Sequence, residues 1–292
     1  MKLRVPGDKS ISQRALILAA LADGESRLRG LLTSQDPIST AEAIGKMGVA
    51  MPALPGDGGE LRIRGLGLRG WKPPSGELDL GNSGTGARLL LGALAAQPFR
   101  AVVTGDGSLR GRPMARVTEP LGLMGAHFEY LEEPGRLPLV VGPSPGLRGV
   151  DLDLPVASAQ VKSALLLAGL VAGVPVLLTE PGASRDHTER MLLYLGVDIE
   201  AEGTAVRLRG GQEWQGRDIT VPGDPSSAAF LLGAALIIPD SEVTVRNICI
   251  NPTRSGFFDI VSEMGGDITF SGERVEGGEP VADITARTSR LK

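Results

Sequence analysis

The sequence predicts an α/β repeat fold (also describable as α+β repeats) with about four strand–helix–strand–helix–strand–strand units. The first observation is a recurring pattern in which an extended segment leads into a small or hydroxyl residue that opens an Ala/Leu-rich helix. Ser10, Ser83, Ser158 and Ser226 mark these starts, 73, 75 and 68 residues apart. The second is that 41 glycines and 21 prolines are spread along the chain, as short strands and tight turns require. This period suits a repeated supersecondary unit.

The first unit is expected to start with a helix over 15–22, which directly follows the polar stretch 5–14. A second helix is predicted over 36–47, because Pro37 suits a first helical turn and apolar residues then recur at helical spacing. Strands are expected at 28–32, 49–53 and 61–66. These elements define the order that the later units should repeat.

The second and third units repeat this order, and each predicted second helix is followed by a glycine that is typical of helix C-termini. Extended approaches are expected at 78–80, 152–154 and 219–221. Helices are expected at 82–96, 114–124, 158–171 and 186–195, and strands at 101–104, 126–131, 137–141, 174–179, 197–201 and 205–209. The fourth unit predicts helices at 226–235 and 256–264 and strands at 241–246, 267–270 and 281–286.

Composition excludes several classes of protein. The 292 residues, 42% of them hydrophobic, suffice for two domains with substantial cores. A net charge of −4 argues against nonspecific nucleic-acid binding, and two histidines argue against a His-based metal site. The single cysteine, Cys249, indicates a reducing compartment and is interpreted as a buried small hydrophobe. With neither a secretory signal nor an apolar run of membrane-spanning length, a cytoplasmic protein without membrane partners is expected.

The stretch 5–14 (VPGDKSISQR) is the strongest candidate site. It places Lys9, Ser10 and Arg14 at a helix start, where unpaired N–H groups and a partial positive charge favour anions, most plausibly phosphate. The alternative is a surface helix with Ser10 as its N-cap. Repetition of such starts favours one shared anion site over four independent caps.

Five motifs resemble the 5-enolpyruvylshikimate-3-phosphate synthase family, in order and across the whole chain, and most closely its bacterial branch with an SRDHTE segment. The motifs are PGDKSISQR at 6–14, GNSGTGAR at 81–88, GDGSLRGRPM at 105–114, SAQVKSA at 158–164 and SRDHTERML at 184–192. The resemblance implies a two-domain fold of six such units, about four of them present. It places a complete first domain at 9–222 and about one unit of the second at 1–8 plus 223–292.

The function implied by this resemblance is enolpyruvyl transfer in the shikimate pathway to chorismate and aromatic amino acids. The enolpyruvyl group of phosphoenolpyruvate passes to the 5-hydroxyl of shikimate-3-phosphate, and phosphate is released. The chemistry needs an acid and a base but no cofactor and no metal. A monomer is expected, with the two small-molecule substrates as its partners.

The site residues implied by the resemblance fall into two groups. For shikimate-3-phosphate they are Lys9, Ser10, Arg14, Ser158, Ala159, Gln160 and Arg185, with Ala159 offering only its backbone. For phosphoenolpyruvate they are Lys9, Asn82, Gly84, Arg112 and Gln160. Lys9 is the one candidate for proton transfer, although a purely electrostatic role is the simpler interpretation. Gly84 matches a position that leaves room for glyphosate, so sensitivity to that inhibitor is expected.

The sequence differs from the family pattern at its C-terminus. Family members continue well beyond Lys292, and the absent part holds their catalytic Asp and Glu and further phosphoenolpyruvate-binding arginines. The chain is therefore expected to be truncated. The alternative function is a chain that binds shikimate-3-phosphate with little or no turnover.

Other residues keep simpler interpretations beside the functional ones. Lys162 and Arg88 face either the cleft or solvent, and Asp186 with His187 is either a catalytic pair or a helix cap. Arg110 is expected to be more peripheral than Arg112, and Asp224, Ser226 and Ser227 are expected to cap the fourth unit's helix.

Two further functions were weighed. The sister enzyme that acts on a UDP-amino sugar opens with Lys-Asn and uses a loop cysteine. It is rejected because Ser10 follows Lys9 and Cys249 is predicted in a strand. A phosphate-binding repeat protein without enzymatic activity accounts for the helix starts but not for five motifs in order.

Overall fold

The computed structural model describes residues 1–56 and 58–292 and confirms the α/β repeat class. The helices are α1 (Lys9–Leu21), α2 (Gln35–Lys46), α3 (Gly84–Leu94), α4 (Gly107–Arg110), α5 (Ala115–Leu123), α6 (Ala159–Ala172), α7 (His187–Tyr194), α8 (Pro225–Ile237) and α9 (Gly256–Glu263). The strands are β1 (Lys2–Leu3), β2 (Asp23–Arg29), β3 (Glu60–Leu66), β4 (Leu78–Asp79), β5 (Ala101–Thr104), β6 (His127–Tyr130), β7 (Leu139–Gly142), β8 (Val150–Asp153), β9 (Val176–Thr179), β10 (Ile199–Glu202), β11 (Ala205–Leu208), β12 (Ile219–Thr220), β13 (Glu242–Cys249), β14 (Asp267–Glu276) and β15 (Glu279–Arg287).

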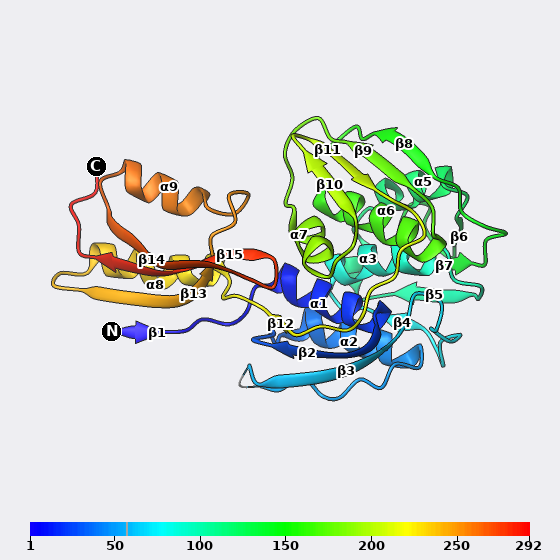
Figure 1. The fold of residues 1–292 in the computed structure, drawn as a ribbon, viewed down its shortest axis with the longest axis horizontal. Helices are drawn as coiled ribbons and strands as arrows, with labels where there is room; N and C mark the ends of the chain where they lie inside the picture. Colours follow the sequence, from blue (N-terminus) through cyan, green and yellow to red (C-terminus); the bar gives the residue numbers. More distant parts are fainter. Residues whose placement is uncertain (57) are drawn as a thin grey trace.

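The described residues form four sheets in two bodies (Figure 1). The large body holds the sheets β12-β2-β3, β4-β5-β7-β6 and β8-β9-β11-β10, which surround α1, α3 and α6. The small body holds the sheet β1-β13-β15-β14 with α8 and α9. Each body has its own cluster of buried hydrophobic residues. No helix in the described part of the chain combines the length and the apolar character that crossing a membrane requires.

Two units exchange their first strands, which the sequence pattern does not reveal. In the second and third units the strand before the first helix pairs in parallel with the strand after it, β4 with β5 and β8 with β9. Ile219, just ahead of α8, instead pairs with Leu28 of the first unit's β2. Lys2, ahead of α1, pairs with Thr244 of the small body's β13. The chain therefore crosses between the bodies twice, once before α1 and once after β12.

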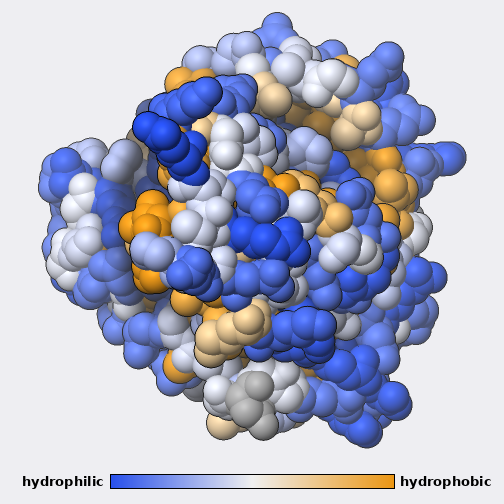
Figure 2. Space-filling model, turned by 90° about the vertical axis from the view of Figure 1, so that its left-hand side faces the viewer, coloured by the Kyte–Doolittle hydropathy of each residue, from blue (hydrophilic) through white to orange (hydrophobic). Residues whose placement is uncertain are grey.

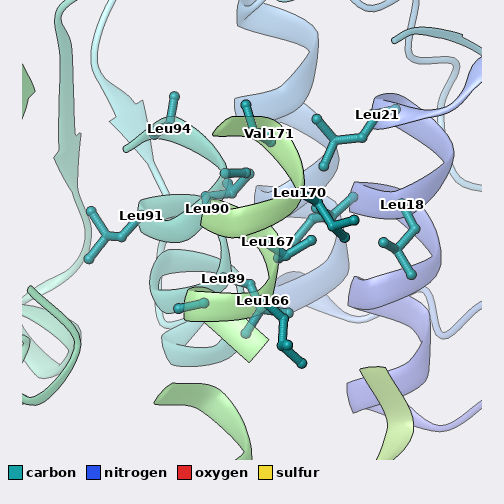
Figure 3. Close-up of a cluster of buried hydrophobic side chains, with 14 of the residues drawn as sticks. Leu18, Leu21, Leu89, Leu90, Leu91, Leu94, Leu166, Leu167, Leu170 and Val171 are labelled. Carbon is teal, nitrogen blue, oxygen red and sulfur yellow. The ribbon is translucent and has the colours of Figure 1, made fainter. Parts of the chain in front are cut away.

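The central helices of the large body are buried on nearly every side. In α1 every residue after Lys9 is buried, and Figure 3 shows Leu18 and Leu21 of α1 beside leucines of α3 and α6. Burying one such side chain stabilises the fold by about 1.5–3 kcal/mol. Helices α3 and α6 approach so closely that a Cβ on Gly92 would lie 2.1 Å from the carbonyl oxygen of Ala164. Glycine is therefore required at this crossing.

Most predicted helices are confirmed within two residues, but the start of the first one is wrong. The first helix starts at Lys9 rather than at residue 15, because the Asp8 carboxylate accepts a hydrogen bond from the Ile11 N–H at 2.9 Å and caps it. Ser10, the cap in the alternative interpretation, lies inside the helix. Of the three residues expected to cap the fourth unit's helix, Asp224 is the cap, since its carboxylate accepts from the Ser226 N–H, whereas Ser226 and Ser227 lie inside the helix.

The predicted strands were less accurate in the first unit. The strand expected at 28–32 lies at Asp23–Arg29, and its pairing with β3 begins at Asp23. Residues 49–53, all of them described, are in irregular backbone, and Pro52 has no N–H to donate to a neighbouring strand. Cys249 is in a strand and buried, as predicted, and burial raises the pKa of its thiol.

Candidate anion-binding cleft

The N-termini of α1, α3 and α6 meet at one end of the large body. The side-chain amide of Gln13 on α1 donates to Ser83 Oγ, the N-cap of α3, at 2.8 Å. The amide of Gln160 on α6 donates to Thr85 Oγ1 on α3 at 2.9 Å. A cleft of about 680 Å³ opens beside the α6 start and is lined by Ser158, Ala159, Gln160 and Arg185, together with residues such as Arg116 and Thr253. Three helix starts and several cations therefore border one region, which suits a multiply charged anion.

Arg14 lies beneath the surface of this region and is held from three sides. Its guanidinium donates to Thr188 Oγ1 at 2.7 Å, to Ser163 Oγ at 3.0 Å and to the Ser10 carbonyl at 3.0 Å. The pKa of Arg14 is lowered to about 10, mainly by burial; Glu189 opposes this shift and Arg185 adds to it. Arg14 therefore remains cationic at neutral pH and supplies charge from below.

Ser10 follows one cation in the chain and contacts another that lines the cleft. The Arg185 guanidinium, half-buried in the loop before α7, donates to Ser10 Oγ at 3.3 Å. Lys9 is 52% exposed and its Nζ lies 3.3 Å from a carboxylate oxygen of Asp36 on α2. The pairing holds the ammonium near the start of α1, where its positive charge reinforces the helix dipole in attracting an anion.

The start of α6 presents its backbone and one amide side chain. Ser158 is the N-cap, with its Oγ accepting from the Val161 N–H at 3.5 Å and its own N–H donating to Glu180 Oε1 at 2.7 Å. Ala159 is 7% exposed. Gln160 accepts from the Arg88 guanidinium at 3.1 Å, so this amide connects the α6 start to α3.

The α3 side is organised around Asn82 and two arginines. The Arg112 guanidinium donates to Asn82 Oδ1 at 2.5 Å, and the Asn82 amide donates to both carboxylate oxygens of Asp106. These hydrogen bonds hold the pKa of Asp106 below its ordinary value. A Cβ on Gly84 would lie 2.9 Å from an Arg88 nitrogen and 3.0 Å from an Arg112 nitrogen. Glycine at 84 thus lets two guanidinium groups approach the helix start.

A family model described as EPSP synthase (3-phosphoshikimate 1-carboxyvinyltransferase) matches residues 1–292. The chain belongs to the EPSP synthase family. It is 52% identical over 290 residues to a 3-phosphoshikimate 1-carboxyvinyltransferase of Roseobacter denitrificans, covering 98% of this chain and 64% of that protein. It is 51% identical to the protein of the same name from Geobacter metallireducens, over all of this chain and 67% of that one.

A solved structure of EPSP synthase from Acinetobacter baumannii superposes with a TM-score of 0.94 at 45% identity. That match covers all of this chain and 65% of the solved one. The chain thus spans about two thirds of the length of the relatives it matches.

The structure brings the predicted residues of this EPSP synthase family chain into two adjoining groups. One lies around α1, α6 and α7, and the other around the start of α3; Gln160 touches both through Thr85 and Arg88. The first group consists of Lys9, Ser10, Arg14, Ser158, Ala159 and Arg185, and the second of Asn82, Gly84 and Arg112. Arg110 bonds to Thr104 and Gly105 on the outer side of this group, as its predicted peripheral role requires.

Two neighbouring side chains of the family motifs were expected to face either the cleft or solvent, and for one of them, Lys162, both alternatives are wrong. Lys162 faces neither cleft nor solvent: it is buried, with its Nζ 2.7 Å from carboxylate oxygens of both Glu180 and Glu189. Arg88 is 3% exposed, so it does not face solvent; it donates to Gln160, which lines the cleft, and burial lowers its pKa to about 10.

The pair Asp186 and His187 connects the two bodies of this EPSP synthase family chain. Asp186 heads α7, but its carboxylate accepts from Arg190 and from Asn251 of the small body, so the predicted side-chain cap is wrong. His187 Nδ1 lies 2.7 Å from Glu279 Oε1 in β15. Neither Glu180 nor Glu279 could be predicted from the sequence, because each is a single acidic residue outside any recognised motif.

Proposed function

We propose that this chain forms the substrate-binding part of a 3-phosphoshikimate 1-carboxyvinyltransferase. The observation that carries the proposal is the cleft at the α6 start, where Ser10, Ser158 and Arg185 converge beside the buried charge of Arg14. A phosphate monoester carries about two negative charges at neutral pH, and this arrangement offers it backbone N–H groups, hydroxyls and two guanidinium groups. Shikimate-3-phosphate is therefore assigned to this group.

The second anionic substrate, phosphoenolpyruvate, is assigned to the α3 side. The Arg112 fork, held by Asn82, suits a carboxylate or a phosphate, and the bare backbone at Gly84 permits close approach. Gln160 lies between the two groups, and Lys9 supplies charge at the start of α1. Holding both anions together in this way replaces a rare encounter between them with a fixed geometry.

In the proposed reaction the 5-hydroxyl oxygen forms a bond to C2 of phosphoenolpyruvate, while the hydroxyl proton leaves and the terminal methylene gains a proton. Loss of a proton from the resulting methyl group and cleavage of the C2–O bond to phosphate then give the enol ether. The residues named above bind and orient the anions and offset their charge. Among these residues only Lys9 is a candidate for proton transfer, and we favour a purely electrostatic role for it.

We also propose that residues 9–222 form one domain and that 1–8 with 223–292 belong to another. The separate hydrophobic clusters and the pairing of β1 with β13 support this division. A cytoplasmic monomer is proposed on the strength of the single buried cysteine and the self-contained large body.

Calorimetric titration of the chain with shikimate-3-phosphate tests the proposal. Saturable binding is expected, weakened at least about tenfold in Arg185→Ala, because a charge-assisted hydrogen bond to a ligand contributes about 1.5–3 kcal/mol. The matched control is Arg209→Ala, which removes an arginine that is 80% exposed on the large body. Absence of binding by folded protein would refute the function, and unchanged affinity in Arg185→Ala would refute the residue assignment.

Two additions separate the remaining alternatives. Phosphate release with both substrates distinguishes an enzyme from a chain that binds shikimate-3-phosphate with little or no turnover. Titration with glyphosate in the presence of shikimate-3-phosphate tests the α3 side: binding is expected, and Gly84→Ala is expected to weaken it because the new Cβ displaces the Arg88 and Arg112 guanidinium groups.

A further inference from the structure

Glu180, which follows β9 directly, uses both carboxylate oxygens to join two segments of the cleft. Its Oε1 accepts from the Ser158 N–H at 2.7 Å, at the start of α6. Its Oε2 accepts from Ser184 Oγ at 2.8 Å, next to Arg185 in the loop before α7. Its own N–H donates to the Thr204 carbonyl, so the backbone at 180 is tied to the β10–β11 turn. One buried carboxylate thus sets the spacing between the two segments that line the cleft from opposite sides.

The Glu180 carboxylate lies in a buried chain of alternating charges. Lys162 Nζ lies 2.7 Å from Glu180 and 2.7 Å from Glu189, and all three side chains are at most 5% exposed. Burial alone would lower the pKa of Lys162, but the two carboxylates outweigh this and raise it. Glu189 also opposes the lowering of the Arg14 pKa. The sequence of charges beneath the cleft is therefore Arg14, Glu189, Lys162 and Glu180.

A buried network of charges contributes little net stability to a fold. Desolvation of buried ions commonly offsets their mutual attraction, so well-packed apolar residues often stabilise a core as much or more. A carboxylate with fixed oxygens does something that an apolar side chain cannot do, because it accepts from two donors in defined directions. The geometry therefore points to alignment of the cleft segments as the role of the network.

We propose that Glu180 is a positioning residue for binding of the phosphorylated substrate. It holds the α6 start and the Arg185 loop at the separation at which Ser158, Gln160 and Arg185 face one anion, and Lys162 pairs with its carboxylate. The proposal rests on the proposed function for the identity of the ligand, but the alignment itself can be observed without any ligand.

Glu180→Gln is the sharpest test, because it preserves size while replacing one acceptor oxygen by an N–H₂ group that faces a donor. In the single variant Lys162 keeps only Glu189 of its two carboxylates, which leaves one positive charge in excess. The double variant Lys162→Met/Glu180→Gln removes that ammonium, so that the charges of Arg14 and Glu189 balance again, and guards against simple unfolding. The control is Glu202→Gln, an exposed acidic residue on β10 of the same sheet. Each variant is examined by thermal unfolding, by amide hydrogen exchange at 158–160 and 184–186, and by calorimetric titration with shikimate-3-phosphate.

The expected result is faster exchange in both segments of the Glu180 variants and a dissociation constant raised at least about tenfold. The double variant should recover unfolding temperature without recovering affinity, a separation that a merely structural role would not produce. Exchange in both segments unchanged in a folded Glu180 variant would overturn the inference, as would affinity recovered together with stability. If the unaltered chain fails to bind shikimate-3-phosphate, the proposed function falls, and hydrogen exchange alone still decides the role of Glu180.

Discussion

Helices α6 and α8 open the third and fourth units with similar Ala/Leu-rich sequences, yet their surroundings differ. In α6, 12 of 14 residues are buried, because α3, α5 and β9 all pack against it. In α8 only 5 of 13 are buried, since it rests with one face on β13 and β15. Phe230 and Ile237 of α8 are 82% and 71% exposed, and Figure 2 shows hydrophobic patches on the side where the small body lies. Apolar composition predicts a helix, but neighbouring elements decide how much of it is buried.

The largest difference between the two helices is expected when one large side chain is removed from each. Leu167→Ala in α6 leaves a cavity in a fully packed site and should lower the free energy of unfolding by about 2–5 kcal/mol. Phe230→Ala in α8 removes a side chain that contacts mostly solvent and should change it by no more than about 0.5 kcal/mol.

Urea unfolding can follow the two bodies separately. Both tryptophans, Trp71 and Trp214, are buried in the large body and donate to carbonyls of α1, so their fluorescence reports that body. The far-UV circular dichroism signal includes, in addition, the small-body helices α8 and α9. Equal losses in the two variants would show that α8 is covered in solution.

A smaller contrast, with opposite signs, is expected at the helix glycines. Gly92→Ala places a methyl group 2.1 Å from the Ala164 carbonyl oxygen, so α3 and α6 must separate at a cost of about 1–3 kcal/mol or more. The Cβ added by Gly233→Ala in α8 meets its nearest neighbouring atom, on Phe257, at 3.9 Å, and the substitution should stabilise the helix by about 0.5–1 kcal/mol. Differential scanning calorimetry measures both shifts, and a destabilised Gly233→Ala protein would contradict the open surroundings described for α8.

The smallest expected effect concerns the contact between the bodies and appears as a change in pH dependence. Burial raises the pKa of Glu279, but hydrogen bonds from His187 and Asn251, with the charge of Arg190, outweigh it and hold that pKa below its ordinary 4.5. Because the folded-state pKa is lowered, the stabilisation by Glu279 is fully present above about pH 4.5 and is lost as the pH falls through the folded value.

Glu279→Gln should therefore destabilise the chain at neutral pH, and its difference from the unaltered chain should shrink on acidification. Unfolding midpoints measured between neutral pH and about pH 3 test this, with the exposed Glu263→Gln in α9 as control. A difference that stays constant throughout this range would mean that ionisation of Glu279 contributes nothing to the contact.

The sequence predicted the helices well because their signals are local. The glycines after 124, 195 and 264 and the apolar spacing of each helix fix boundaries within two residues. The family motifs also contained Ser10, Ser158 and Arg185, which lie close together in the structure. Features that depend on distant residues were not predicted. The burial of Lys162 depends on Glu180 and Glu189 from other segments. The contact between the two bodies depends on Glu279, 92 residues after His187. Partners supplied from distant parts of the chain leave no periodic trace in the sequence.

The exchange of first strands has a consequence for how the chain emerges from the ribosome. The sheet that contains Leu28 of β2 is complete only after Ile219 has been synthesised. At about 5–20 residues per second, this delay is roughly 10–40 s. During that interval the parallel edge of β2 is open in the nascent polypeptide, and an open edge invites pairing with other chains. Vectorial synthesis therefore exposes the first unit for longest, and a nascent-chain chaperone would protect most at this edge.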